Sequence, residues 1–147
     1  MAYTTDKIHL VAFDIPSPPN YGGVIDVYYK IEALYKIGIE IELHCWQYGG
    51  RERDIQLTKL CSKVHYYQRN RIMNPFNGPL PYIVKTRYSK ELLDNLNRDN
   101  APILFEGLHT TAPLFYRQLE GRHTVIRNHN IESDYYRLLS EKESKTF

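Results

Sequence analysis

The stretch from Phe13 to Gly38 constrains the fold more than any other part of the chain. A short apolar segment, 8–14, runs into a loop with three prolines, and the Gly22-Gly23 pair then precedes a helical pattern. Apolar residues recur there at the spacing of one buried helix face, and Gly38 follows the last of them, where helices commonly end. Segment 39–45 alternates apolar and polar residues, as a strand does. This order predicts a β-α-β unit, and hence a parallel sheet with a right-handed crossover.

The remaining chain continues this alternation of strands and helices. Strands are predicted at 64–67, 103–105 and 124–126, with a short helix or an irregular turn near 55–60 and a long loop over 68–81. The inward-facing residues expected of the helices are Val24, Val27, Tyr28, Ile31, Leu34, Tyr35, Leu92, Leu93, Leu96, Leu114, Phe115, Leu119, Tyr135, Leu138 and Leu139. The pattern predicts an α/β fold: a Rossmann-like, doubly wound, mainly parallel sheet with helices on both faces, in a single domain over residues 1–147.

Composition narrows the class of protein. The 147 residues are 42% hydrophobic and 24% charged, which suits one globular domain with a real core. A net charge of +2 lacks the basic bias of nucleic-acid binders, so no nucleic-acid partner is expected. No run has the length of a transmembrane helix, and the first residues lack a signal-peptide pattern. Cys45 and Cys61 do not form C-x-x-C, so we predict reduced thiols in a cytoplasmic protein.

Ligands of open α/β sheets bind beyond the carboxyl ends of the strands. Three polar or glycine-bearing segments follow predicted strands here: 16–23, 106–111 and 127–132. The Gly22-Gly23 pair opens a helix, whose free N–H groups and dipole favour an anion, although the pair could equally serve a tight turn or close helix–sheet packing. The three segments together predict a ligand site.

Individual side chains in these segments have both functional and structural readings. His109 could donate a hydrogen bond to a substrate hydroxyl or shuttle a proton, or could satisfy backbone groups at a helix start. Arg127 could hold a phosphate or carboxylate, or pair with Glu106 or Glu132. His129 and Asn130 could line the same cleft, and Asn130 could instead cap a helix. The spacing of the histidines does not match a metal site, so no metal is predicted.

Basic and aromatic residues surround the predicted loop. The cations are Lys63, Arg69, Arg71, Lys85, Arg87 and Lys90, with Tyr66, Tyr67, Phe76 and Tyr82 among them. This composition fits peripheral contact with an anionic membrane at its cytoplasmic face. It also fits an ordinary solvated surface, because Glu52, Asp54 and Glu91 are nearby in the sequence.

Several motifs occur in an order that resembles a known family. They are P-x-x-x-x-G-G (Pro18 to Gly23), L-x-x-x-G (Leu34 to Gly38), I-E-I-E-L, L-F-E-G-L-H (Leu104 to His109) and R-N-H-N-I-E-S-D-Y-Y (Arg127 to Tyr136). From about Lys7 onward the chain resembles the N-terminal domain of a GT-B glycosyltransferase, nearest to the retaining, sugar-nucleotide-dependent glycosyltransferase family four. The last motif is similar to an R-x-H-N-x-E segment of some bacterial members.

The resemblance implies an enzyme with two Rossmann-like domains facing each other across a cleft. It would transfer a sugar, with retention, from a nucleotide-sugar donor to a glycan or lipid-linked acceptor, without a cofactor or metal. Gly22 and Gly23 would approach the donor diphosphate, and His109 would be the catalytic histidine near the transferred sugar. The residues that would line the acceptor side or the cleft are Tyr21, Glu106, Arg127, His129 and Asn130.

The resemblance covers one half of such an enzyme. The donor-binding C-terminal domain, with its pair of glutamates, is absent from these 147 residues, so we expect the chain alone to be inactive. We also expect an open sheet edge, through which copies could associate. Two other classes remain as alternatives: a stand-alone Rossmann-like module that binds a nucleotide or sugar phosphate, and a membrane-surface interaction domain.

Overall fold

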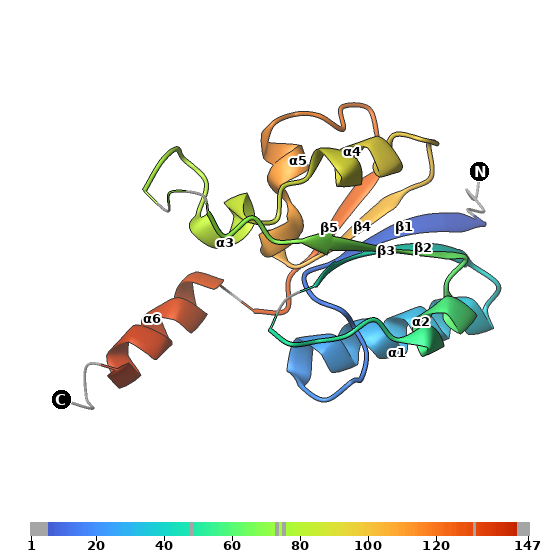
Figure 1. The fold of residues 1–147 in the computed structure, drawn as a ribbon, viewed down its shortest axis with the longest axis horizontal. Helices are drawn as coiled ribbons and strands as arrows, with labels where there is room; N and C mark the ends of the chain where they lie inside the picture. The colour runs from blue at the N-terminus through green and yellow to red at the C-terminus, as the bar shows by residue number, and fades with distance from the viewer. Residues whose placement is uncertain (1–5, 48, 73, 75, 131, 144–147) are drawn as a thin grey trace.

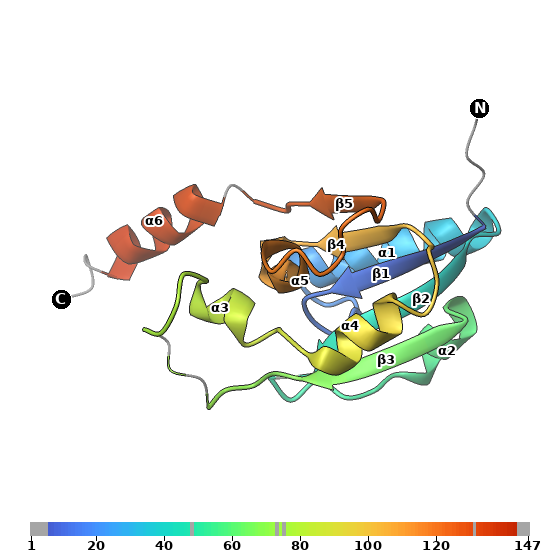
Figure 2. The ribbon, with the colours of Figure 1, turned by 90° about the horizontal axis from the view of Figure 1, so that it is seen from above.

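Five strands form one sheet in a computed structural model that describes residues 6–47, 49–72, 74, 76–130 and 132–143 (Figure 1). The strands are β1 (Lys7–Ala12), β2 (Glu40–Gln47), β3 (Lys63–Gln68), β4 (Ile103–Glu106) and β5 (Thr124–Arg127). All neighbouring pairs are parallel, and the spatial order is β3-β2-β1-β4-β5 (Figure 2). This order reverses direction after β3, as in a doubly wound sheet, so the predicted fold class is confirmed.

Helices cover both faces of the sheet (Figure 1). Helices α1 (Gly22–Lys36) and α2 (Ile55–Leu60) lie on one face. On the other face lie α3 (Tyr82–Lys85), α4 (Lys90–Leu96), the 3-10 turn η1 (Leu108–Thr110) and α5 (Ala112–Phe115). Helix α6 (Glu132–Glu143) projects away from both layers. Within the described ranges, no helix combines the length and the apolarity that crossing a bilayer requires.

The central strand β1 contributes to two cores. Leu10 packs beneath α1 and α2, and Val11 packs beneath α4. Segment 39–45 forms a strand as predicted, but Glu42 and His44 on its polar face are buried rather than solvated. The reason is that a doubly wound sheet has helices over both faces, so the polar residues of β2 lie under α4.

Helix α1 ends as the sequence predicts. Gly38 has φ +85°, its N–H donates to the Tyr35 carbonyl, and the N–H of Ile39 donates to the Leu34 carbonyl. Most of the predicted inner face packs on the sheet, but the prediction for Tyr35 is wrong, since about half of that side chain is exposed. It lies in the last turn, at the margin of the apolar stripe.

Other inward-facing predictions fail near the C-terminal end of the described chain. Phe115 is half exposed, because α5 ends at that residue instead of continuing along the sheet. Tyr135, Leu138 and Leu139 are also substantially exposed, because α6 leaves β5 without returning to cover a sheet face (Figure 2). Val125 and Ile126 of β5 are exposed at the open edge of the sheet. The edge is therefore present, and self-association through it stays a prediction.

The two cysteines are free and buried, in agreement with the predicted reduced thiols. Burial raises the pKa of the Cys61 thiol to about 12, and burial likewise raises the pKa of Cys45. Both thiols are thus protonated at neutral pH and unsuited to nucleophilic chemistry.

Candidate functional site

A cavity of about 630 Å³ lies at the carboxyl ends of β1, β4 and β5. The three polar segments identified in the sequence meet there, as the topology of a parallel sheet requires. The predicted site residues that line this cavity are Tyr21, Gly22, Gly23, His109, Arg127, His129 and Asn130. Only Glu106, among the predicted residues, does not line it, because the side chain is fully buried behind the wall.

One wall of the cavity is the start of α1. Tyr21 occupies the N-cap position in an extended conformation, and no side chain caps the helix there. The first N–H groups of a helix have no intrahelical partner, so this uncapped, 15-residue helix offers donors and a positive dipole end to the cavity. Tyr21 instead donates its hydroxyl proton to Asp14, at 2.7 Å.

The two glycines of this helix start have different surroundings. A Cβ on Gly23 would stand 2.7 Å from Cζ of Phe13, whereas a Cβ on Gly22 would meet no atom within 4 Å. Neither glycine has a positive φ, so the tight-turn reading is wrong. Close packing against Phe13 explains why residue 23 is a glycine but does not explain Gly22. Gly22 lines the cavity and has open space beside it.

Arg51 holds the loop that leads from β1 to α1. Its guanidinium donates to the carbonyls of Ile15 and Pro18, at 2.9 and 2.6 Å, and to Oδ1 of Asn20, at 2.8 Å. The same group lies over the ring of Tyr21, 5.4 Å from its centroid. The sequence analysis assigned no role to Arg51, which fixes the approach of the loop to the glycine pair.

His109, in the 3-10 turn after β4, also lines the cavity. The Phe13 ring stands edge-on to two histidines, with its centroid 6.1 Å from that of His109 and 5.8 Å from that of His129. Burial, followed by the nearby charges of Arg87 and Arg69, lowers the pKa of His109 to about 4. The imidazole is therefore neutral at physiological pH, so it can accept or donate one hydrogen bond but brings no cation.

Glu106 organises the wall formed by β4, β5 and α1. Its carboxylate binds Lys30 of α1, and Oε2 lies 3.1 Å from Nε2 of His129 and 3.8 Å from Nη1 of Arg127. Asp26 completes the group, since it pairs with Arg127 and lies 3.5 Å from Nδ1 of His129. The predicted pairing of Arg127 with Glu106 is thus present at long range, while Asp26 is the closer partner.

The protonation of His129 depends on the same group. Burial lowers the pKa of its imidazole, although Glu106 acts in the opposite direction. The cluster then contains two carboxylates, two permanent cations and a neutral imidazole, so its charges nearly cancel.

Metal binding at this wall has a specific obstacle. Ligand atoms of Asp26, Glu106 and His129 lie within 4.8 Å of one another, close enough to surround an ion. Lys30 and Arg127 already neutralise both carboxylates, so a divalent cation would have to displace them.

Besides Arg51, sequence reasoning missed three polar contributors to the site. Asp26 and Lys30 lie one and two helical turns after Gly22, a spacing that places all three on one side of α1 and that the sequence does display. Arg87 lines the cavity although its side chain is almost completely buried, and its Nε donates to the Phe13 carbonyl at 3.0 Å. No local pattern around Arg87 indicates this position, which follows from the packing of α3 against η1.

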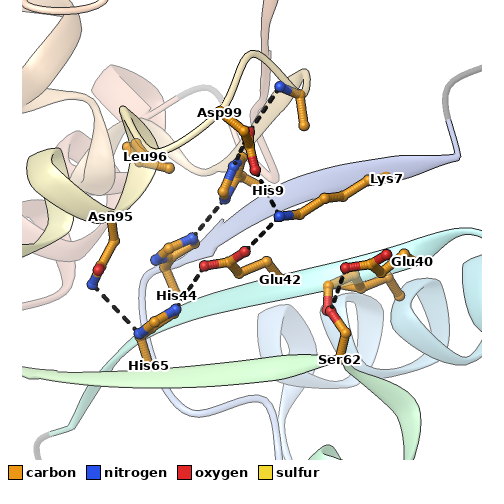
Figure 3. A network of polar contacts seen from close by, with 12 residues as sticks. Lys7, His9, Glu40, Glu42, His44, Ser62, His65, Asn95, Leu96 and Asp99 are labelled. Atoms are coloured by element: carbon orange, nitrogen blue, oxygen red, sulfur yellow. Dashed lines mark hydrogen bonds and ion pairs between the residues drawn. The ribbon is translucent and has the colours of Figure 1, made fainter.

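A second polar cluster lies under α4, away from the cavity lining (Figure 3). His9 Nδ1 and His44 Nε2 are 2.9 Å apart, and His44 Nδ1 is 2.8 Å from the Tyr67 hydroxyl. His9 Nε2 lies 2.9 Å from Oδ1 of Asp99. Asn95 of α4 completes this chain by donating to the Tyr67 hydroxyl at 2.8 Å. The chain of contacts ties β1, β2, β3 and α4 together.

With the rings of His9 and His44 both neutral, one order of protons satisfies every contact in this chain. Burial acts to raise the pKa of Asp99, but hydrogen bonds from Lys7 and His9 outweigh it and hold that pKa below its usual range. The ionised carboxylate only accepts, so His9 Nε2 carries a proton and Nδ1 accepts from His44 Nε2. His44 Nδ1 then accepts from Tyr67, whose oxygen accepts from Asn95.

The charge states of this cluster agree with that order. Burial, with the neighbouring His65 and His9, holds the pKa of His44 well below its usual value, so its ring is neutral. Burial would raise the pKa of Glu42, but hydrogen bonds from Lys7 and His65 lower it to about 2. Atoms of His9, Glu42 and His44 are also close enough to hold a metal, but both ring nitrogens of each histidine already have hydrogen-bond partners.

Comparisons with known proteins give one relative. The chain is 31% identical over 147 residues to an uncharacterized 44.6 kDa protein in the cps region of Klebsiella pneumoniae. The match covers 96% of this chain and 38% of that protein, so the chain spans well under half of its relative's length. No family model matches the chain, and no solved structure matches it significantly.

Proposed function

We propose that the chain is the N-terminal, acceptor-side domain of a GT-B glycosyltransferase of the retaining, family-four type. The observation that carries this proposal is the cavity, in which an uncapped helix start at Gly22, the neutral His109 and the Arg127–Asn130 segment meet at the carboxyl ends of parallel strands. Such an arrangement suits a ligand that combines an anionic diphosphate with a polyhydroxylated sugar.

Each wall of the cavity has a role in this proposal. The N–H groups at the start of α1 approach the donor diphosphate, and the open space beside Gly22 admits its oxygens. His109 forms a hydrogen bond with a hydroxyl of the transferred sugar, for which a neutral imidazole is suited. Arg127, His129 and Asn130 contact the acceptor, and the buried Glu106 positions the first two of these.

The relative supports a role in carbohydrate biosynthesis. The name of that protein places it in a cps region, a term for capsule polysaccharide. A glycosyltransferase that adds a sugar to a glycan or lipid-linked acceptor is the kind of enzyme that building a polysaccharide needs. The domain that binds most of the donor is proposed to lie outside these 147 residues, as the greater length of the relative allows.

Sugar transfer is the test of this proposal. Protein in which the domain is joined to its donor-binding half is incubated with labelled nucleotide sugars and with a lipid extract or a glycan mixture, and the label in the lipid and glycan fractions is counted. His109→Ala is expected to reduce the transfer rate by roughly 10²- to 10⁴-fold. The matched control is His123→Ala, an exposed histidine outside the cavity, which should keep full activity. Transfer that survives His109→Ala, or no transfer from any nucleotide sugar, overturns the proposal.

A further inference from the structure

The loop between β3 and α3, residues 69–81, displays two large apolar side chains. Ile72 is 97% exposed and Phe76 is 93% exposed, the highest values among the large hydrophobic residues described. The loop projects from the same end of the sheet as the cavity (Figure 1). Single exposed apolar residues are common on protein surfaces, but two nearly complete exposures in one loop are an unusual concentration.

The described residues of this loop make specific hydrogen bonds. The Lys85 side chain is buried beneath it and donates to the backbone carbonyls of Asn74, at 3.2 Å, and Asn77. Oδ1 of Asn70 accepts from the N–H of Ile72, and Oδ1 of Asn74 accepts from the N–H of Phe76. Both exposed residues are therefore held by their own backbone contacts, so the loop maintains an apolar tip in water at a cost in solvation.

The charged residues in the sequence around this loop are all basic. Residues 63–90 contain six of the 19 basic residues of the chain and none of its 17 acidic residues. The basic and aromatic surface that the sequence suggested is smaller in the structure, because Lys85, Arg87 and Tyr67 are buried. Arg71 remains exposed beside Ile72, and Arg69 is partly exposed at the base of the loop, where it donates to Thr86. Along the sequence, the nearest charged residues on both sides of the apolar tip are therefore basic, and the nearest acidic residues are Asp54 and Glu91.

We infer that the β3–α3 loop is a membrane-contact element, which inserts Ile72 and Phe76 into the surface of a bilayer containing anionic phospholipids. Apolar side chains gain free energy on leaving water at the interface, and arginines beside them are attracted to anionic headgroups. A protein partner would need an apolar pocket beside an acidic surface to match the loop, whereas an anionic bilayer offers an apolar interior beneath negative headgroups over its whole surface. This inference does not depend on the proposed transferase activity.

Vesicle co-sedimentation tests the inference with the 147-residue chain itself. Binding is measured to phosphatidylcholine vesicles with and without phosphatidylglycerol, at low and high salt. We expect the chain to bind the anionic vesicles, with salt weakening the binding. The Ile72→Ser/Phe76→Ser double variant should bind about tenfold more weakly or worse. Arg71→Gln should weaken binding by about fivefold.

The matched control is Ile37→Ser. Ile37 is 73% exposed at the other end of α1, so its replacement removes a comparable apolar surface far from the loop. Unchanged circular dichroism and melting temperature establish that each variant is folded. No binding to anionic vesicles overturns the inference, as does binding that the double variant retains or that Ile37→Ser reduces equally.

Discussion

Nε2 of His129 lies 3.1 Å from Oε2 of Glu106, a carboxylate that solvent does not reach. A buried carboxylate at the end of β4 thus lies against a histidine that follows β5, while its other oxygen binds Lys30 on α1. Three elements that are distant in sequence are joined at this one side chain. The wall of the cavity consequently depends on the charge of Glu106.

Glu106→Gln tests this dependence. The change keeps the shape of the side chain but removes the charge that balances Lys30, so we expect the free energy of unfolding to fall by about 3 kcal/mol. Urea denaturation measures the change. Glu120→Gln, which alters an exposed glutamate paired with Arg117, is the control and should change stability by less than about 0.5 kcal/mol. Equal stability of the two variants would contradict the role given to Glu106.

The glycine pair provides a matched test of the helix start. Gly23→Ala brings a Cβ to 2.7 Å from Phe13, so we expect it to lower stability by about 1–3 kcal/mol. Gly22→Ala meets no atom and should leave stability unchanged or slightly higher. If the proposed function is right, Gly22→Ala should nevertheless weaken donor binding, because the added methyl group occupies the space beside the N–H groups of the helix start. Thermal melts and donor KM separate the two effects, and a Gly22→Ala enzyme with unchanged KM would argue against the assigned phosphate contact.

His109 should titrate near pH 4. Burial disfavours the charged ring, so the folded protein binds this proton less readily than the unfolded chain, whose ordinary histidine pKa is 6.5. The contribution of His109 to stability is therefore present above pH 6.5 and is lost as the pH falls toward 4. The measurement is an NMR titration of the ring protons, with the signal assigned by His109→Gln. A midpoint near 6.5 would show that the ring is not buried as described.

The stability of the polar cluster under α4 should depend on the hydroxyl of Tyr67. Tyr67→Phe removes the proton that His44 Nδ1 accepts and leaves a buried nitrogen unsatisfied, so we expect a loss of about 1–3 kcal/mol in the free energy of unfolding. Tyr35→Phe, at an exposed tyrosine, should be neutral. Nitrogen chemical shifts of His9 and His44 should also report the proton on Nε2 in both rings. A proton on Nδ1 of either ring would refute the assigned order.

The fold could be predicted because the β-α-β pattern around Gly22 is local and strongly periodic. Positions of the polar loops relative to one another followed from the parallel topology alone, and this brought seven of the eight predicted site residues to the cavity. Glu106 was placed in the correct region, but as a lining residue, because sequence does not show how deeply a strand-end carboxylate is buried.

The incorrect predictions of burial and exposure have one physical cause. Whether a side chain is buried depends on which layer covers it, and periodicity within one element cannot show this. Glu42 and His44 looked like the solvated face of a strand, yet α4 covers them. Leu138 looked like the inner face of a helix, yet α6 has no described layer to cover. Arg87 reaches the cavity and Arg51 reaches the loop before α1 from separate parts of the chain, and only tertiary packing brings them there.

The central claim is that this cavity is half of a nucleotide-sugar site, with the diphosphate at the start of α1. The most direct measurement is an NMR titration of the 147-residue chain with uridine diphosphate, followed through the backbone amide signals. We predict shifts centred on Gly22 and Gly23 and an affinity weaker than about 100 μM, since the proposed function assigns most of the donor contacts to a second domain. Absence of these shifts at saturating ligand, or binding far tighter than this, would contradict the account and, in the second case, favour a stand-alone binding module.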